Sequence, residues 1–174
     1  IEGGTVVNTH EQSVIEDAVV LIRGKRIVAV GKKGDVALPA CAKPVNAKGK
    51  FIIPGLIDGH THLVWLFSIP EFVRHAAPGG TTTVVAETME AYPVAGLDGV
   101  LDVMASFAGQ PIKIFGTAPT MASTSRAASG VAPEDLEKIL SLEDVVGLGE
   151  SYWQAVLQDP DRYLPEMAAT LDRG

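Results

Sequence analysis

The chain has 174 residues, of which 47% are hydrophobic, so it is long and apolar enough to bury a substantial core. Its net charge of −7, with acidic residues spread along the chain, argues against a nucleic-acid backbone as a partner. Cys41 is the only cysteine, which excludes an intrachain disulfide, and neither a signal peptide nor a bilayer-spanning apolar run is recognisable. These features predict a soluble cytoplasmic protein without nucleic-acid or membrane partners.

Residues 1–52 are predicted to form a small β module. Short β-branched and apolar runs indicate strands at residues 5–7, 18–23, 26–30, 45–47 and 50–53. Gly24-Lys25 suits a two-residue hairpin turn with glycine at its first central position. We therefore assign residues 1–52 to one β-rich domain and residues 53–174 to another.

From Pro54 onward strands alternate with helices, which predicts parallel strands joined by crossover connections. The expected strands are 56–60, 81–86, 111–115 and 145–148, and the expected helices are 69–77, 96–109, 133–140, 152–157 and 162–171. Small polar residues at 121–132 indicate a mobile loop over the carboxyl ends of these strands. Residues 53–174 are roughly half of the ~250 residues that a complete (β/α)8 barrel takes, so we expect its first four βα units.

His60 and His62 end the first of these strands, directly after a Pro-Gly turn. Side chains two residues apart on a strand point to the same side, so both imidazoles aim at one point. Neutral imidazole is a common ligand of divalent metals. Two histidines at this spacing often arise by chance, but the carboxyl end of a buried strand is where α/β barrels keep their chemistry. Asp58 lies two residues before His60, so its side chain points to the same side of the strand, and it is a candidate partner of the histidines or of the metal.

Three more carboxylates follow later strands. Glu150 ends the strand at 145–148, and its two oxygens are able to bridge two divalent ions; the alternative is an acidic helix start that accepts backbone hydrogen bonds. Glu87 and Glu90 follow the strand at 81–86, level with the histidines, and are candidates for contacts with a substrate or with the metal ligands. His10 and His75 are interpreted as ordinary solvated or packed residues.

The stretch Pro54–His62 resembles the first-strand signature of the amidohydrolase superfamily of metal-dependent hydrolases. Gly79–Val84 resembles the segment that opens the second barrel strand there. Two further segments, Gly96–Gly99 and Gly147–Glu150, resemble the adenine deaminase branch of that superfamily. The likeness extends over nearly the whole chain, and its first motif is the most specific.

The resemblance implies a hydrolase of C–N bonds that uses one or two divalent ions, such as Zn, Mn or Fe. It implies His60, His62 and Glu150 as metal ligands and a small-molecule substrate, with adenine and water giving hypoxanthine and ammonia in an adenine deaminase. It further implies that residues 1–52 are half of a composite β-sandwich. Because the family's other ligands and its catalytic base follow on later strands, the chain is expected to be an N-terminal portion in which no catalytic residue is assignable.

Two alternatives to adenine deamination remain open. Members of the branch tend to show Asp-Pro-His-Glu where this chain has the segment Glu87–Glu90, and Met89 offers a thioether that hard ions bind poorly. One alternative is therefore a hydrolase of cyclic or linear amides, similar to dihydroorotase or hydantoinase. The other is a scaffold fragment without activity. Since a half barrel leaves two sheet edges uncovered, we expect a homo-oligomer or pairing with the missing half.

Overall fold

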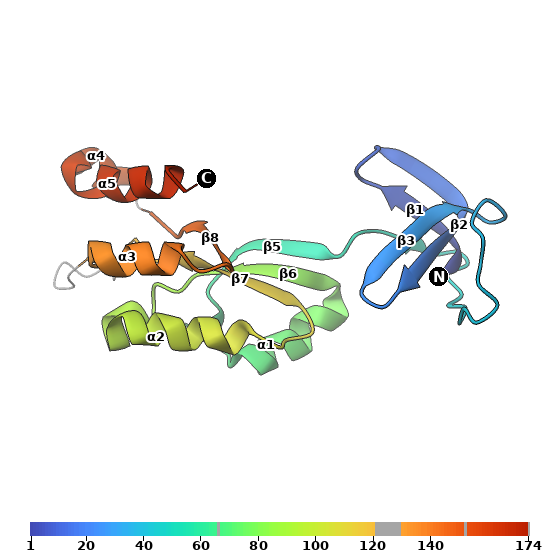
Figure 1. Cartoon of the computed structure of the whole chain (residues 1–174), viewed down its shortest axis with the longest axis horizontal. Coiled ribbons are helices and arrows are strands. Elements are labelled where there is room, and N and C mark those ends of the chain that lie inside the picture. The colour runs from blue at the N-terminus through green and yellow to red at the C-terminus, as the bar shows by residue number, and fades with distance from the viewer. Residues whose placement is uncertain (66, 121–129, 152, 174) are drawn as a thin grey trace. The chain divides into compact units, whose positions relative to one another are not determined.

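The computed structural model describes residues 1–65, 67–120, 130–151 and 153–173. Their contacts divide the chain into two compact units, residues 1–54 and 55–174, which are described separately (Figure 1). Most of the loop predicted at 121–132 lies outside the described residues. Among the helices of the described part, none combines the length and the apolar character that crossing a membrane requires.

The first unit is a four-stranded sheet in the order β3-β2-β1-β4. Its strands are β1 (Glu2–Asn8), β2 (Ser13–Arg23), β3 (Arg26–Lys32) and β4 (Phe51–Ile52). The first three pair antiparallel and β4 joins β1 in parallel. Gly24 opens the β2–β3 turn with a φ of +61°, which confirms the hairpin predicted at Gly24-Lys25.

The strands expected at 45–47 and 50–53 are shorter than predicted. One reduces to a bridge between Asn46 and Glu2, and the other to the two residues of β4. The chain turns between them, because the Asn46 side chain accepts a hydrogen bond from the Lys48 backbone N–H (2.9 Å) and Gly49 has a φ of +74°.

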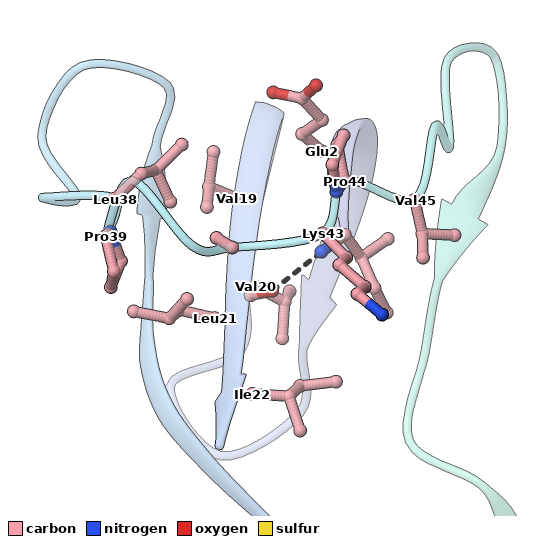
Figure 2. Close-up of a pocket in the computed structure, with 12 residues that line it drawn as sticks. Glu2, Val19, Val20, Leu21, Ile22, Leu38, Pro39, Lys43, Pro44 and Val45 are labelled. Carbon is pink, nitrogen blue, oxygen red and sulfur yellow. Dashed lines mark hydrogen bonds between the residues drawn. The ribbon is translucent and has the colours of Figure 1, made fainter. Parts of the chain in front are cut away.

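A groove of about 390 Å³ lies within the first unit, between β2 and the segment at residues 38–45 (Figure 2). Apolar side chains from both sides face it, among them Val19, Leu21, Leu38 and Val45. None of the six candidate site residues lines it.

The second unit is built on a parallel sheet. Its four strands are β5 (Leu56–Thr61), β6 (Thr81–Ala86), β7 (Lys113–Ala118) and β8 (Val145–Leu148). They pair in chain order, which confirms the predicted α/β class with parallel strands. Sequential order is what an α/β barrel requires, but across the described ranges the four strands form an open sheet, so the half barrel stays a prediction.

In the described part of the second unit, five helices and two short 3₁₀ turns accompany this sheet. They are η1 (Leu63–Trp65), α1 (Ile69–Ala76), η2 (Ala77–Gly79), α2 (Tyr92–Phe107), α3 (Pro133–Leu140), α4 (Trp153–Gln158) and α5 (Pro160–Leu171). The helix predicted from residue 96 begins instead at Tyr92, with a kink where Gly96 has a φ of +60°. Similarly, α5 starts at Pro160 rather than at 162, because proline suits a first helical turn.

Helices α1, α2 and α3 pack along one face of the parallel sheet and form two apolar clusters (Figure 1). The first joins α1 to β6 and β7 through Leu63, Ile69, Val73, Val84, Ala86, Phe107, Ile112 and Ile114. The second joins α2, α3 and β7 through Val100, Ala118, Val131, Leu136 and Ile139. Met104 packs against both clusters, and Phe107 is buried in the first. The strand ends are thereby held on a packed support.

Candidate metal centre

The candidate site lies where the strands of the second unit end. His60 belongs to β5 and His62 follows its last residue, while Glu87 and Glu90 follow β6 and Glu150 follows β8. Backbone hydrogen bonds continue beyond the strands and keep these ends together. The Glu87 N–H donates to the Thr61 carbonyl (2.8 Å), and the N–H of Gly149 donates to that of Ala118 (2.8 Å). Parallel pairing therefore brings residues far apart in the sequence to one edge.

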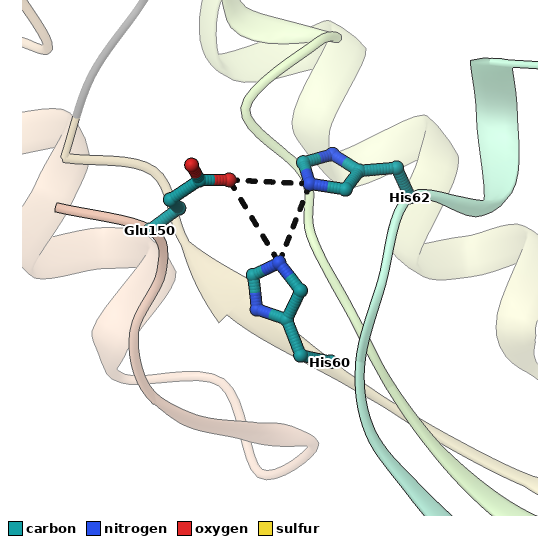
Figure 3. Close-up of side chains that lie close together, drawn as sticks. All are labelled: His60, His62 and Glu150. Carbon is teal, nitrogen blue, oxygen red and sulfur yellow. Dashed lines mark hydrogen bonds and ion pairs between the residues drawn. The ribbon is translucent and has the colours of Figure 1, made fainter. Parts of the chain in front are cut away.

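Three side chains converge there, as Figure 3 shows for His60, His62 and Glu150. The two Nε2 atoms are 3.3 Å apart. Glu150 Oε2 lies 3.2 Å from His62 Nε2 and 3.8 Å from His60 Nε2. Two ligand atoms that each bind a tetrahedral zinc ion at about 2.1 Å are themselves about 3.4 Å apart. The spacing of these three donor atoms is thus the spacing that one such ion requires.

Two carboxylates, one buried and one mostly buried, stand behind the imidazoles. Glu90 Oε1 is hydrogen-bonded to His62 Nδ1, and Glu87 Oε1 lies 3.5 Å from His60 Nδ1. Glu87 is only 2% exposed. The second oxygen of each carboxylate, Oε2, is buried and has no hydrogen-bond partner among the described residues. Buried oxygens of this kind are costly unless positive charge is near.

Glu150 is held through its backbone on both sides. Its N–H donates to Glu87 Oε1 (3.1 Å), and its carbonyl accepts a hydrogen bond from Thr120 Oγ1 (2.8 Å). Thr120 Oγ1 also lies 3.1 Å from Ser151 Oγ. These contacts fix the start of the segment after β8 against the loop after β7. Sequence reasoning missed Thr120, for which the only signal is a hydroxyl shortly after the third strand.

Asp58 is placed differently from the other candidates. Its Oδ1 accepts a hydrogen bond from the His60 backbone N–H (3.2 Å), so the carboxylate turns back onto the strand. It is not part of the three-residue group that converges. Trp65, which the sequence analysis did not single out, stacks on the His62 ring with centroids 4.5 Å apart and planes at 26°. Its position three residues after His62 is the only sequence signal.

The surrounding charges favour a cation at this point. Burial opposes charging of the His62 ring, but the hydrogen bond and charge of Glu90, together with the charges of Glu87 and Glu150, raise its pKa above the ordinary value. The remaining histidines lie elsewhere. His10 is exposed in the β1–β2 turn, and His75 is exposed on α1.

No model of a known protein family matches the chain. It is 30% identical to an adenine deaminase of Ruegeria sp. (strain TM1040), over all of this chain and 30% of that protein. It is 32% identical to an adenine deaminase of Geobacillus kaustophilus (strain HTA426), over 86% of this chain and 26% of that protein. The predicted likeness to adenine deaminases is therefore confirmed as sequence similarity, and the chain spans about 30% of the length of such relatives.

The fold also has a solved counterpart. Atrazine chlorohydrolase TrzN from Arthrobacter aurescens TC1, determined in complex with zinc, superposes with a TM-score of 0.50 at 17% sequence identity. The match covers 85% of this chain and 45% of that one. At this identity the likeness concerns the fold alone.

Proposed function

We propose that His60, His62 and Glu150 bind a divalent metal ion in a hydrolase of C–N bonds of the amidohydrolase type. The observation that carries this proposal is the convergence of two imidazole nitrogens and one carboxylate oxygen from β5 and β8 at mutual distances of 3.2–3.8 Å. Two nitrogens and one oxygen form a donor set that suits zinc and other first-row divalent ions. The sequence similarity to adenine deaminases supports the type of reaction.

The residues around the three donors fit such an ion. Three carboxylates surround two imidazoles, so the local charge is negative when both rings are neutral and no cation is bound. The unpartnered Oε2 atoms of Glu87 and Glu90 add to this negative charge inside the protein. A divalent ion between the donors would offset it.

A bound divalent ion would supply Lewis-acid chemistry, which acidifies water and polarises an electrophilic carbon. The chain's own part is to hold the three donors in place. Glu90 orients the His62 ring, Glu87 lies behind the His60 ring, and Thr120 anchors the Glu150 backbone. We assign no catalytic acid or base among the described residues.

For the substrate we propose adenine first, with hypoxanthine and ammonia as products, because the relatives in sequence carry the name adenine deaminase. A cyclic or linear amide is the second candidate. It is favoured by Met89, which lies between Glu87 and Glu90 in the sequence. The adenine deaminase branch tends to have histidine at this position, and a thioether is a poor ligand for hard ions. Both substrate classes contain an electrophilic carbon bonded to nitrogen, which is the atom that such an ion would polarise.

The test is metal binding by purified, metal-depleted protein, measured by calorimetric titration with Zn²⁺ and Mn²⁺ and by elemental analysis. The variant His60→Ala/His62→Ala is compared with His10→Ala/His75→Ala, which removes the same number of imidazoles from exposed positions. We expect the wild type and the control to bind the ion tightly and the site variant to lose it. Equal binding by both variants, or no binding by the wild type, would contradict the metal site.

Turnover is tested separately on the metal-loaded chain by ammonia release from adenine and by ring opening of cyclic amides. Hydrolysis of adenine supports the first substrate, and hydrolysis of amides alone supports the second. A chain that binds the ion but releases no product from either class corresponds to the scaffold interpretation.

A further inference from the structure

We propose that Glu87 and Glu90 are positioning residues that fix the protonation of the two imidazoles in front of them. Glu90 keeps the ring proton of His62 on Nδ1 through a hydrogen bond, and Glu87 favours the same tautomer of His60 through its nearby negative charge, so that each Nε2 carries a lone pair. This inference rests on the metal site proposed above, and it concerns how the protein prepares the ligands before any ion arrives.

His62 is hydrogen-bonded to its carboxylate, Glu90. A neutral imidazole has one N–H and one lone pair, and an ionised carboxylate only accepts hydrogen bonds. The hydrogen bond between His62 Nδ1 and Glu90 Oε1 therefore requires the proton on Nδ1. Both side chains are mostly buried, at 19% and 13% exposed, so water competes little for this bond. The lone pair is left on Nε2, which lies 3.2 Å from Glu150 Oε2.

His60 has the same orientation, but it is near its carboxylate without a hydrogen bond to it. Its Nδ1 lies 3.5 Å from Glu87 Oε1, and its Nε2 faces both His62 Nε2 (3.3 Å) and Glu150 Oε2 (3.8 Å). With both rings protonated on Nδ1, three lone-pair atoms face one another with no proton among them. Lone pairs that face one another repel, so this arrangement favours a bound cation, which is how a metal site is preorganised.

Glu87 has a second role because it also accepts the Glu150 backbone N–H (3.1 Å). One carboxylate thus holds a ring from β5 and the backbone after β8. The room for it comes from Gly149, where a Cβ atom would collide with Glu87 Oε2 and lie 2.8 Å from Thr117 Oγ1. The glycine is therefore part of the same arrangement.

The chain contains a built-in contrast. His75 Nε2 lies 3.0 Å from Glu71 Oε1 and 3.3 Å from Arg74 Nη2, and the shorter contact, which is to the carboxylate, predicts its proton on Nε2. If hydrogen bonding to carboxylates sets the tautomer, His62 and His75 must show opposite tautomers in one sample. A general preference of the imidazole ring would give them the same one.

The experiment is a long-range ¹⁵N–¹H correlation spectrum of the metal-free chain at about pH 9, more than two units above the ordinary histidine pKa. Such spectra distinguish Nδ1–H from Nε2–H. The chain has 4 histidines, so single alanine variants assign the signals. We expect Nδ1–H for His62 and His60 and Nε2–H for His75. Wild-type His62 with its proton on Nε2 would overturn the proposal.

Variants of Glu90 then test the cause. Glu90→Gln keeps a hydrogen-bond acceptor and should retain Nδ1–H, whereas Glu90→Ala should shift His62 toward Nε2–H. Removing such a partner typically costs about 10–100-fold in metal affinity, and we expect this loss for the alanine variant and a smaller one for glutamine. An unchanged tautomer in a folded Glu90→Ala would refute the assigned role. If that variant does not fold, the wild-type and Glu90→Gln spectra still decide.

These measurements separate the two proposals. The tautomers are determined without any ion, so a wrong tautomer overturns the positioning role even when the wild type binds zinc. The absence of zinc binding by the wild type overturns the metal site, whatever the tautomers are.

Discussion

In residues 1–54 successive strands mostly run in opposite directions, whereas the four strands described in residues 55–174 run the same way. Antiparallel neighbours place alternate strand ends at opposite edges. Parallel neighbours place every carboxyl end at one edge, so His60, Glu87 and Glu150 meet although they are far apart in the chain. Strand direction, rather than proximity in the sequence, therefore brings the residues of the candidate site together.

The two units also differ in packing. The first has a single small cluster around Val6, Ala18 and Val20. The second has two larger clusters beneath the strand ends. A metal site needs donors held to within fractions of an ångström, which a packed support supplies.

The largest effect on stability is expected when an isoleucine is replaced by alanine in the second unit, and the same replacement in the first unit is the comparison. Ile139 is 0% exposed and Ile27 is 65% exposed. We expect Ile139→Ala to lower the free energy of unfolding by roughly 2–5 kcal/mol, because it leaves a cavity. Ile27→Ala should cost less than about 1 kcal/mol, the span of strand propensities.

Urea unfolding followed by tryptophan fluorescence and by circular dichroism measures both variants. Both tryptophans lie in residues 55–174, so fluorescence reports on the second unit and circular dichroism on the whole chain. Equal losses of stability for the two variants would remove the distinction between the units.

An intermediate effect is expected where the strand ends are most crowded. Gly149→Ala should displace the Glu87 carboxylate and lower zinc affinity by roughly tenfold, the lower end of the range for partners of metal ligands. Gly79→Ala is the control, because a Cβ there would meet no atom within 4 Å. Zinc affinity is measured by competition with a chromophoric chelator. Equal affinities in the two variants would show that Gly149 leaves the site unaffected.

The sequence predicts several elements of the second unit to the residue, and the reasons are local. The strand at 81–86 follows Gly80, whose φ of +97° ends the preceding turn, and the helix at 133–140 begins with proline at its first position. The start of α2 is less predictable. Residues 92–95 extend the helix before the kink at Gly96, and the strands at 45–47 and 50–53 depend on pairing with β1.

For the site, the His-x-His pattern and the strand ends suffice to nominate His60, His62 and Glu150. The direction of each ring does not follow from the pattern, since it depends on carboxylates that approach only when β5 and β6 pair. Thr120 could not be identified from the sequence either, because its role also depends on a contact that forms only in the folded chain. Its partner is a backbone carbonyl 30 residues away, which leaves no trace in residue type.

The smallest effect concerns a carboxyl group away from the site. Burial raises the pKa of Glu166 on α5, and the charge of Arg162 offsets this only in part. Because the folded-state pKa is raised, folding favours the protonated form, and this stability is lost as the pH rises through the folded pKa. Glu166→Gln stays neutral, so it should be more stable than the wild type at pH 7, by up to about 0.5 kcal/mol.

This advantage should shrink as the pH falls toward the ordinary glutamate value of about 4.3, where the wild-type side chain is itself protonated. Thermal unfolding at a series of pH values measures it. A constant difference between pH 4 and pH 7 would contradict the raised pKa. The result also shows how far the second unit tolerates a half-buried charge outside its strand ends.

The separation of the donors along the chain has a consequence for synthesis. Glu150 leaves the ribosome roughly 5–18 s after His60, at translation rates of about 5–20 residues per second. During that interval the nascent polypeptide presents two adjacent imidazoles without the carboxylate, and such a pair binds Cu²⁺ more tightly than Zn²⁺. The proposed metal site is therefore incomplete until β8 has emerged, and until then Cu²⁺ competes with Zn²⁺ for the two imidazoles.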